Sequence, residues 1–244
     1  MFSTYTCIEV SFGEWLIWRF NRSNGISGPE RIFMPADCLW DPKAMADQFA
    51  VSIPQGKILF LLNLSQTVVR FSDSLDPDTT FPFGDRSSKY IFSHNIIEEK
   101  KFWMTALPAE ISHRLVEMCR LKRIHPNRIQ AIDTLEYRMA HYFGKQYKAP
   151  LWLLLPQVPG IRLITMEGGL PCSCYFFSND FRFQELARLW MCQSIPPQYA
   201  IVLAEDEDMR YQWLREFLEE KSVELLRHDQ GQDFKQAMIE EFVT

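Results

Sequence analysis

The stretch that decides the fold is CIEVSFGEWLIWRF, Cys7 to Phe20. Two segments with alternating apolar residues flank the four residues Ser11-Phe12-Gly13-Glu14. Alternation on both sides of a short turn predicts a β-hairpin at the start of the chain. In several nucleotide-binding folds an opening hairpin of this kind holds a phosphate group with its backbone N–H groups. The first question is therefore whether this hairpin binds a phosphate or keeps only the shape.

Length and composition narrow the class of protein. The chain has 244 residues, 47% of them hydrophobic, which is enough for one bilobal domain or two small domains with a packed core. A net charge of −5 without a basic block argues against nucleic-acid binding. No apolar run approaches the roughly 20 residues that span a bilayer, and the N-terminus, MFSTYTCIEV, does not read as a signal peptide. We therefore expect a cytoplasmic protein without a membrane span in this chain.

The residue types that usually carry metal or redox chemistry are scattered. The six cysteines contain no CxxC pair, so neither a zinc site nor a disulfide framework is indicated. Cys172 and Cys174 would share one face of a strand, but no neighbouring Cys or His pair completes a metal site, and we interpret them as ordinary strand residues. The sequence also has no GxSxG hydrolase motif. It therefore predicts no metal, no cofactor and no catalytic residue.

The first half of the chain predicts five strands and three helices around one insertion. The strands are expected at 4–11, 15–20, 31–34, 57–64 and 128–132. The helices are expected from Asp41, as the cap, to about Ala50, over 108–123, and from Asp133 to Gly144. The apolar face of the second helix is predicted to consist of Ile111, Leu115, Met118 and Leu121. The insertion, 65–107, contains three more predicted strands, at 67–71, 90–96 and 101–105.

The second half repeats this order. Its strands are expected at 150–155, 160–167, 170–177, 199–203 and 223–227, with Gly168-Gly169 as a two-residue turn. Its helices are expected from 179 or 180 to about 193, over 207–221, and over 232–242. Each half thus reads strand, strand, strand, helix, strand, helix, strand, helix. The pattern predicts an α/β protein of two lobes, each with a mixed five-stranded sheet between helices, facing each other across a cleft.

This doubled order resembles the actin-like superfamily, and within it most of all the type IV pilus protein PilM and the cytoplasmic part of the type II secretion protein GspL. YTCIEVSFGEWLIWRF and LWLLLPQVPGIRLITMEGGLPCSCYFF stand where the family has its two phosphate hairpins. RLVEMCRLKRIHPNRIQAIDTLEYRMAHYF is similar to the family's long helix, following strand and next helix. AIVLAEDEDMRYQWLREFLEEKSVELL stands where ATP-binding members contact the nucleoside. The resemblance implies two actin-like (RNase H-like) lobes, 1–148 and 149–244, with a small β-rich insertion at about 65–107 in the first.

The resemblance also identifies a nucleotide site whose residues are altered. In the first hairpin, Glu9, Ser11 and Gly13 stand at the phosphate-binding positions, and Phe12 is expected to obstruct a phosphate. The second hairpin reads LPQVPG around Gln157, without the usual acid and hydroxyl and with two prolines that lack N–H donors. The turn LAEDED, which contains Glu205, carries four acids that repel phosphate and favour a helix start instead. We therefore expect a degraded nucleotide site at Glu9, Ser11, Gly13, Gln157 and Glu205.

The insertion is the expected partner-binding part of the chain. In PilM-like proteins a small subdomain packs beside the first lobe, and a short cytoplasmic tail of a membrane protein docks between them. The resemblance implies the same arrangement here in reduced form, since no helix is evident in the insertion. A strand edge can accept an extended peptide by backbone pairing. The candidate contact residues are Val68, Arg70 and Phe71 on a predicted strand, with core packing favoured for Val68, and Phe81 and Phe83 on a predicted surface loop.

The resulting hypothesis is a non-catalytic scaffold at the cytoplasmic face of a type IV pilus or type II secretion platform. Its expected partner is a short cytoplasmic segment of an inner-membrane protein, and homodimerisation is open. The alternative is a divergent ATPase or sugar kinase of the same superfamily, for which Glu9 is the best support. A third possibility is a structural or regulatory protein unrelated to pili.

Overall fold

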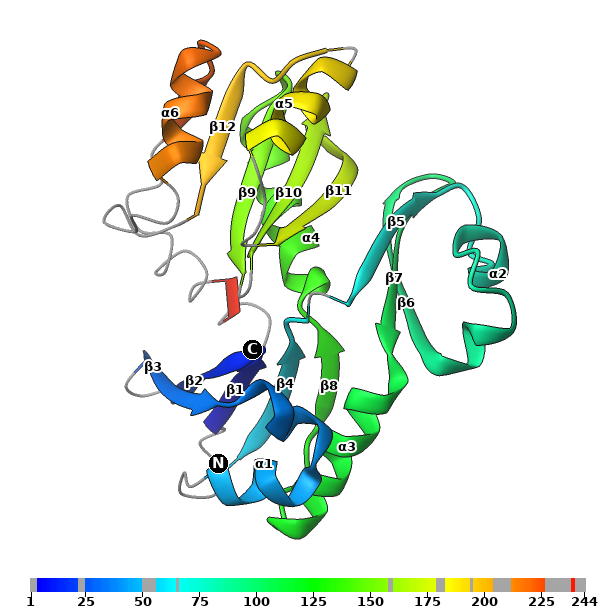
Figure 1. Cartoon of the computed structure of the whole chain (residues 1–244), viewed down its shortest axis with the longest axis vertical. Helices are drawn as coiled ribbons and strands as arrows, with labels where there is room; N and C mark the ends of the chain where they lie inside the picture. Colours follow the sequence, from blue (N-terminus) through cyan, green and yellow to red (C-terminus); the bar gives the residue numbers. More distant parts are fainter. Residues whose placement is uncertain are drawn as a thin grey trace. The chain divides into compact units, whose positions relative to one another are not determined.

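The protein consists of two compact units with one five-stranded sheet each. The computed structural model describes residues 4–21, 25–49, 56–64, 66–157, 160–178, 183–193, 195–203, 212–226 and 238–239. The first unit comprises residues 1–135 and 236–244, and the second comprises residues 136–235. Figure 1 shows the sheets of both units and the helices beside them. The first unit is therefore assembled from both ends of the chain.

The sheet of the first unit has the strand order β3-β2-β1-β4-β8. Its strands are β1 (Thr4–Val10), β2 (Gly13–Asn21), β3 (Gly25–Met34), β4 (Lys57–Leu62) and β8 (Arg128–Ala131). The first three are antiparallel, whereas β1, β4 and β8 run parallel. Strand β3 begins at Gly25, earlier than the predicted start at Arg31, because residues 25–27 continue to pair with the end of β2 beyond a register shift. Because β1, β4 and β8 are parallel, their carboxyl ends lie at the same edge of the sheet.

One face of this sheet carries the core of the first unit. Ile8, Val10, Phe60 and their neighbours pack with residues of α1 (Pro42–Gln48) and α3 (Ala109–Leu121). The Asp41 carboxylate accepts the backbone N–H of Lys43 at 2.9 Å, so Asp41 caps α1 as predicted. A 3₁₀ helix, η1 (Ala36–Trp40), precedes it.

The predicted apolar face of α3 needs one correction. Ile111, Leu115 and Met118 are buried, but Leu121 is 59% exposed. Leu121 is the last residue of α3, where the chain turns away into the segment before β8. The helical spacing of apolar residues therefore extends to Leu121, one apolar position beyond the part of α3 that packs on the sheet.

The sheet of the second unit repeats this topology. Its order is β11-β10-β9-β12-β13, which matches the first sheet position by position. The strands are β9 (Leu151–Gln157), β10 (Gly160–Glu167), β11 (Leu170–Ser178), β12 (Tyr199–Val202) and β13 (Glu224–Leu226). On one face, Trp152, Leu154 and Leu163 pack with residues of α5 (Phe183–Cys192) and α6 (Gln212–Glu220). The predicted starts of these helices, at 179 or 180 and at 207, and most of the predicted helix 232–242 lie outside the described residues.

Helix α4 (Asp133–Gln146) joins the two units and runs through Gly144, where we had predicted its end. A Cβ atom on Gly144 would lie 1.9 Å from the backbone oxygen of Gly169, in the turn between β10 and β11. Gly144 is thus required for the close approach of a helix to a hairpin and does not terminate the helix. The Lys148 ammonium donates to the Gly144 carbonyl at 3.0 Å beside this contact.

A buried ion pair also connects α4 to the second sheet. Arg162 on β10 lies 3.1 Å from the Glu136 carboxylate, and their side chains are 1% and 3% exposed. Arg162 is on the opposite strand face from Ile161 and Leu163, which belong to the α5 and α6 core. The second sheet therefore has an apolar core on one face and contacts α4 on the other.

The insertion forms a separate three-stranded antiparallel sheet with the order β5-β7-β6. Its strands are β5 (Val68–Ser72), β6 (Tyr90–Glu98) and β7 (Lys101–Pro108). Between β5 and β6 lie two short helices that the sequence did not predict, α2 (Pro77–Thr80) and the 3₁₀ helix η2 (Gly84–Lys89). The Asp76 carboxylate caps α2, and its hydrogen bonds from Thr79 and Asp78 lower the pKa of Asp76. Among the described helices, none combines the length and apolar character needed to cross a bilayer.

Candidate functional site

The turn of the first hairpin is closed by its own hydrogen bonds. The backbone N–H of Ser11 donates to the Glu14 carbonyl at 3.3 Å, and the Ser11 hydroxyl donates to the same oxygen. Gly13 has a φ of +90°, which the β-carbon of other residues disfavours. A Cβ on Gly13 would meet no heavy atom within 4 Å, so glycine is needed there for backbone conformation alone.

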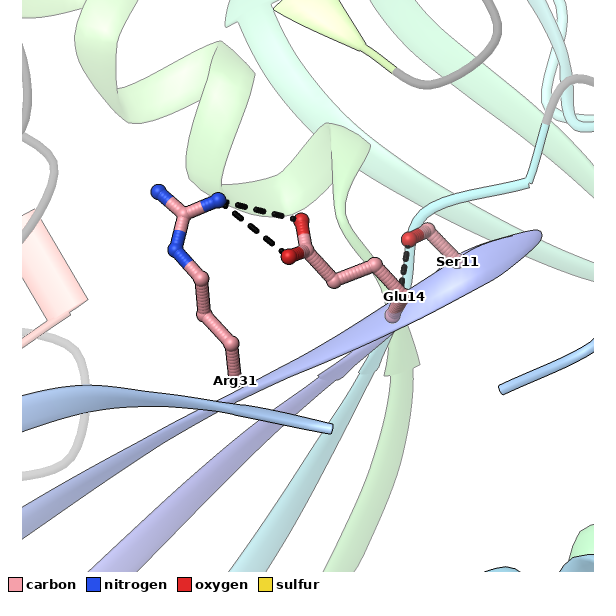
Figure 2. Close-up of polar contacts among 3 residues, drawn as sticks. All are labelled: Ser11, Glu14 and Arg31. Carbon is pink, nitrogen blue, oxygen red and sulfur yellow. Dashed lines mark hydrogen bonds and ion pairs between the residues drawn. The ribbon is translucent and has the colours of Figure 1, made fainter. Parts of the chain in front are cut away.

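An ion pair braces the same turn from β3. The Arg31 Nη1 atom lies 3.2 and 3.4 Å from the two oxygens of the Glu14 carboxylate. Figure 2 shows the Arg31 guanidinium pointing at this carboxylate, and the Ser11 hydroxyl hydrogen-bonded to the backbone of Glu14. The Arg31 side chain is 58% exposed, so solvent screens the pair. The Arg31 guanidinium, the cation in these contacts, is thus paired with the Glu14 carboxylate.

Phe12, in the turn of the first hairpin, contributes to packing, and its expected obstruction of a phosphate remains a prediction. Its side chain is partly buried and packs against the apolar core of the first unit. The Phe12 side chain therefore packs against the core beneath the hairpin. The backbone N–H and the hydroxyl of Ser11 are both bonded to the Glu14 carbonyl within the turn.

Buried carboxylates lie where the parallel strands of the first sheet end. Glu9, 3% exposed, accepts a hydrogen bond from the Asn63 side-chain amide at 2.5 Å. Asp133, at the start of α4 and fully buried, accepts a hydrogen bond from the Thr105 hydroxyl of β7. Buried carboxylates require polar partners of this kind because burial removes their hydration. The carboxyl edge of a parallel sheet is also where α/β proteins bind ligands.

Sequence reasoning found Glu9 as a site residue and placed Asp133 only at the start of a helix, and it missed Asn63 and Thr105. Asn63 directly follows the buried strand β4, so a polar residue at the end of an apolar run was the available signal. Thr105 lies inside β7, where its sequence neighbours give no sign that a carboxylate from residue 133 reaches it.

The other predicted nucleotide contacts are only partly described. Gln157 ends β9 and pairs with Gly160 at the start of β10, and residues 158–159 between them lie outside the described residues. The Gln157 side chain and the whole of Glu205 lie outside the described residues. The assignment of these positions to a degraded nucleotide site remains a prediction.

The five predicted partner-binding residues are divided between two faces of the insertion sheet. Val68 and Phe83 are partly buried in the cluster around Met104 and Ala106, and Phe81 in that cluster is 1% exposed. Phe83 stacks on Tyr90 with ring centroids 4.2 Å apart. Arg70 shares the strand face of Val68 and is exposed. Phe71 lies on the opposite face, and its ring centroid is 5.3 Å from that of Trp103.

This arrangement corrects the predicted placement of Phe81. The sequence suggested that Phe81 and Phe83 lie on a surface loop, but Phe81 belongs to the interior of the subdomain. The reason is that the loop folds back over the sheet through α2 and η2, so its aromatic residues supply the small core that three strands lack alone. Arg70 is the predicted contact residue that offers an exposed charge.

The cysteines lie in ordinary structural positions. Cys172 in β11 is exposed, whereas Cys119 in α3 is buried, and burial raises the pKa of Cys119 to about 11. Among the described residues, no three His, Cys, Asp or Glu side chains are grouped so that they would hold a metal ion.

Comparison with known proteins identifies the fold. No protein-family model and no curated protein sequence matches the chain. Among solved structures, it is similar to a protein of unknown function with an actin-like ATPase fold from Bacteroides thetaiotaomicron, with a TM-score of 0.71 and 9% identity. This match covers 97% of this chain and 95% of the other.

Two further similar structures come from a type IV pilus complex and from a type II secretion system. The chain is similar to PilM in a PilM–PilN type IV pilus biogenesis complex, with a TM-score of 0.61, 9% identity and coverage of 95% of this chain and 94% of that one. It is also similar to the cytoplasmic domain of EpsL, an inner-membrane component of the type II secretion system of Vibrio cholerae, with a TM-score of 0.55, 8% identity and coverage of 83% of each chain. At these identities the similarity establishes the fold, and the predicted resemblance is confirmed: the chain has the actin-like fold, with two matching α/β lobes and a β-rich insertion in the first.

Proposed function

We propose that this chain is a non-catalytic, actin-like scaffold of the inner-membrane platform of a type IV pilus or type II secretion system. It would act at the cytoplasmic face of the membrane and bind a short cytoplasmic segment of a membrane protein. The observation that carries the proposal is the closed first hairpin, in which both donors of Ser11 bond to the Glu14 carbonyl. A hairpin that holds phosphate directs such donors at the ligand.

The second hairpin supports the same proposal. Its sequence, LPQVPG, offers no carboxylate for a magnesium ion and no hydroxyl, and Pro156 and Pro159 have no N–H to donate. The fold similarity to PilM and to the EpsL cytoplasmic domain supports the same proposal, since PilM is part of a type IV pilus biogenesis complex and EpsL is an inner-membrane component of a type II secretion system.

The proposed docking place for the partner is β5, an edge strand of the insertion sheet. An extended segment would add to this edge by backbone hydrogen bonds. Arg70, exposed on β5, would pair with an acidic residue of the segment, and Phe71 would contact an apolar one. Phe81, Phe83 and Val68 would support the strand from beneath through their cluster.

A peptide titration tests this proposal. Fluorescent peptides with the sequences of the cytoplasmic tails of pilus and secretion platform proteins from the same genome are titrated with the full chain, and anisotropy reports binding. We expect one tail to bind and Arg70→Glu to weaken it by about five-fold or more. Arg86→Glu, at an exposed residue of η2 in the same subdomain, is the matched control and should leave the affinity within about two-fold. Absence of binding by every tail at about 1 mM would refute the proposal.

The alternative function is a divergent nucleotide-binding ATPase. The observation that favours it is the pair of buried carboxylates, Glu9 and Asp133, at the ends of parallel strands β1 and β8. Calorimetric titration with Mg-ATP separates the two functions, because a scaffold should release no measurable heat of binding at about 100 μM protein. Micromolar affinity that Glu9→Gln lowers ten-fold would establish the nucleotide site and reject the non-catalytic interpretation of the hairpin.

A further inference from the structure

Strand β6 is a long edge strand without the features that normally prevent edge pairing. It has nine residues, Tyr90–Glu98, and in the described part of the chain it pairs only with β7. Its sequence, YIFSHNIIE, contains no proline, lysine or arginine. Ile91 and Ile96 are 44% and 63% exposed on it. A long apolar edge of this kind favours the addition of another strand.

The other edge strands of the described sheets are short or carry protective residues. Strands β8 and β13 have four and three residues. The long edges β3 and β11 contain Pro29 and Pro171, which cannot donate to a new ladder. Strand β5 is shorter, with five residues, and is the proposed docking edge for the membrane-protein segment. The length of β6 and its lack of proline, lysine and arginine indicate that this edge can pair with a further strand.

The sequence of β6 matches itself when it is reversed. In an antiparallel pair of two identical strands centred on His94, Phe92 would lie opposite the partner's Ile96, and Ser93 opposite the partner's Asn95. Ile91 would lie opposite the partner's Ile97. Between residues 91 and 97 apolar residues thus meet apolar ones and polar residues meet polar ones, whereas Tyr90 would lie opposite the partner's Glu98 at the end of the strand. The β6–β7 register is regular from Tyr90 to Ile96, and its one shift lies between Ile96 and Glu98.

The charges at the ends of β6 are complementary in the same register. Lys89, the last residue of η2, precedes the strand, and Glu99, in the turn between β6 and β7, follows it; both are exposed. Within one chain these residues are about 33 Å apart along an extended strand, too far to interact. In the two-stranded arrangement the Lys89 side chain would come near the partner's Glu99, just beyond the paired residues, and the twofold axis repeats this pair at the other end.

We propose that two copies of this chain form a symmetric dimer through antiparallel pairing of their β6 strands about a twofold axis at His94. The dimer joins two three-stranded sheets into one continuous six-stranded sheet. It leaves β5, at the other edge of the insertion sheet, available to a different partner. The self-matching pattern favours a second copy of this chain as the partner. A second copy always presents the matching order of residues, whereas an unrelated peptide would have it only by chance.

The first test compares two exposed hydrophobic residues on two edge strands. Sedimentation velocity over about 1–300 μM should show the full chain moving from 28.8 kDa toward twice that mass. Ile91→Lys should raise the dissociation constant about ten-fold or more, since a lysine would face an apolar residue across the new ladder. Phe33→Lys, at a residue that is 74% exposed on β3, is the matched control and should leave the dissociation constant within about two-fold.

The second test is a charge exchange. Lys89→Glu and Glu99→Lys each place like charges opposite one another twice in the dimer, and each should raise the dissociation constant about five-fold. The double variant Lys89→Glu/Glu99→Lys restores opposite charges and should return to within about two-fold of the unaltered chain. A merely local effect on β6 would make the double variant at least as weak as the single ones.

Three results would overturn the proposal. A chain that remains at 28.8 kDa throughout the concentration series does not dimerise in this way. A dimer that Phe33→Lys disrupts and Ile91→Lys does not would use β3. Failure of the charge exchange to restore the dimer would reject the His94-centred register and, with it, the pairing argued from the sequence of β6.

Discussion

At the scale of single residues, the most consequential contact is the buried pair of Arg162 and Glu136. Both side chains are almost fully buried, so the charge of each depends on the other for compensation. We predict that Glu136→Gln, which keeps the shape and removes the charge, lowers the free energy of unfolding by about 3 kcal/mol. Urea denaturation followed by tryptophan fluorescence measures the change.

The matched control for this prediction is an ion pair on the surface. Arg19 and Glu30 lie 2.6 Å apart with side chains 39% and 45% exposed, so water screens their attraction. Glu30→Gln should change the free energy of unfolding by less than about 1 kcal/mol. Equal losses for the two variants would mean that burial does not set the strength of the Arg162–Glu136 contact.

Single residues also show where sequence reasoning reaches its limit. Glu9 was predicted as a site residue because it stands where the family that the sequence resembles has an acid beside its first phosphate hairpin. Its hydrogen-bond partner Asn63 is 54 residues away, and Thr105 reaches Asp133 across 28 residues. Such pairs depend on which strands become neighbours, and periodicity does not encode this. The burial of Phe81 was missed for the same reason, since its cover comes from other parts of the insertion.

At the scale of elements, the approach of α4 to the β10–β11 turn gives a prediction of unusual sign. Alanine normally stabilises a helix relative to glycine by about 1 kcal/mol. At residue 144, however, the added Cβ would lie 1.9 Å from the Gly169 oxygen. We predict that Gly144→Ala destabilises the protein by about 1–3 kcal/mol, as overpacking does.

Thermal unfolding of two variants checks this prediction. Gln146→Ala lies in the same last turn of α4 at an exposed position and should change stability by less than about 0.5 kcal/mol. If Gly144→Ala is neutral or stabilising, α4 and the hairpin turn are not in contact as described.

The order of the elements could be predicted, and their exact ends could not. All ten strands of the two large sheets were expected, since each is an apolar or alternating run between turn residues. The continuation of α4 through Gly144 was not expected, because a glycine near the end of a helix usually terminates it. The deciding atom, the Gly169 oxygen, belongs to a turn 25 residues further along the chain. The short helices α2 and η2 were missed because they lack the length that makes helical periodicity visible.

At the scale of the whole molecule, the first unit depends on residues close to the end of the chain. Ile239 belongs to that unit and is fully buried. We predict that Ile239→Ala lowers stability by about 2–5 kcal/mol, as truncation of a buried isoleucine does. Hydrogen exchange should become faster in peptides from β1 and β4 than in peptides from β9 and β12.

A surface isoleucine provides the comparison. Ile195 is 51% exposed, and Ile195→Ala should leave exchange in both units nearly unchanged. Faster exchange in β9 and β12 alone after Ile239→Ala would assign Ile239 to the second unit instead.

The division of the chain into 1–135 with 236–244, and 136–235, has a consequence for biosynthesis. A ribosome translates residues 136–235 before it reaches Ile239, so the lobe that contains residues 1–135 is the one completed last. A nascent chain therefore carries this lobe without one of its buried residues until codon 239 is read, and a premature stop shortly before that codon would damage the lobe most of whose residues were translated earlier.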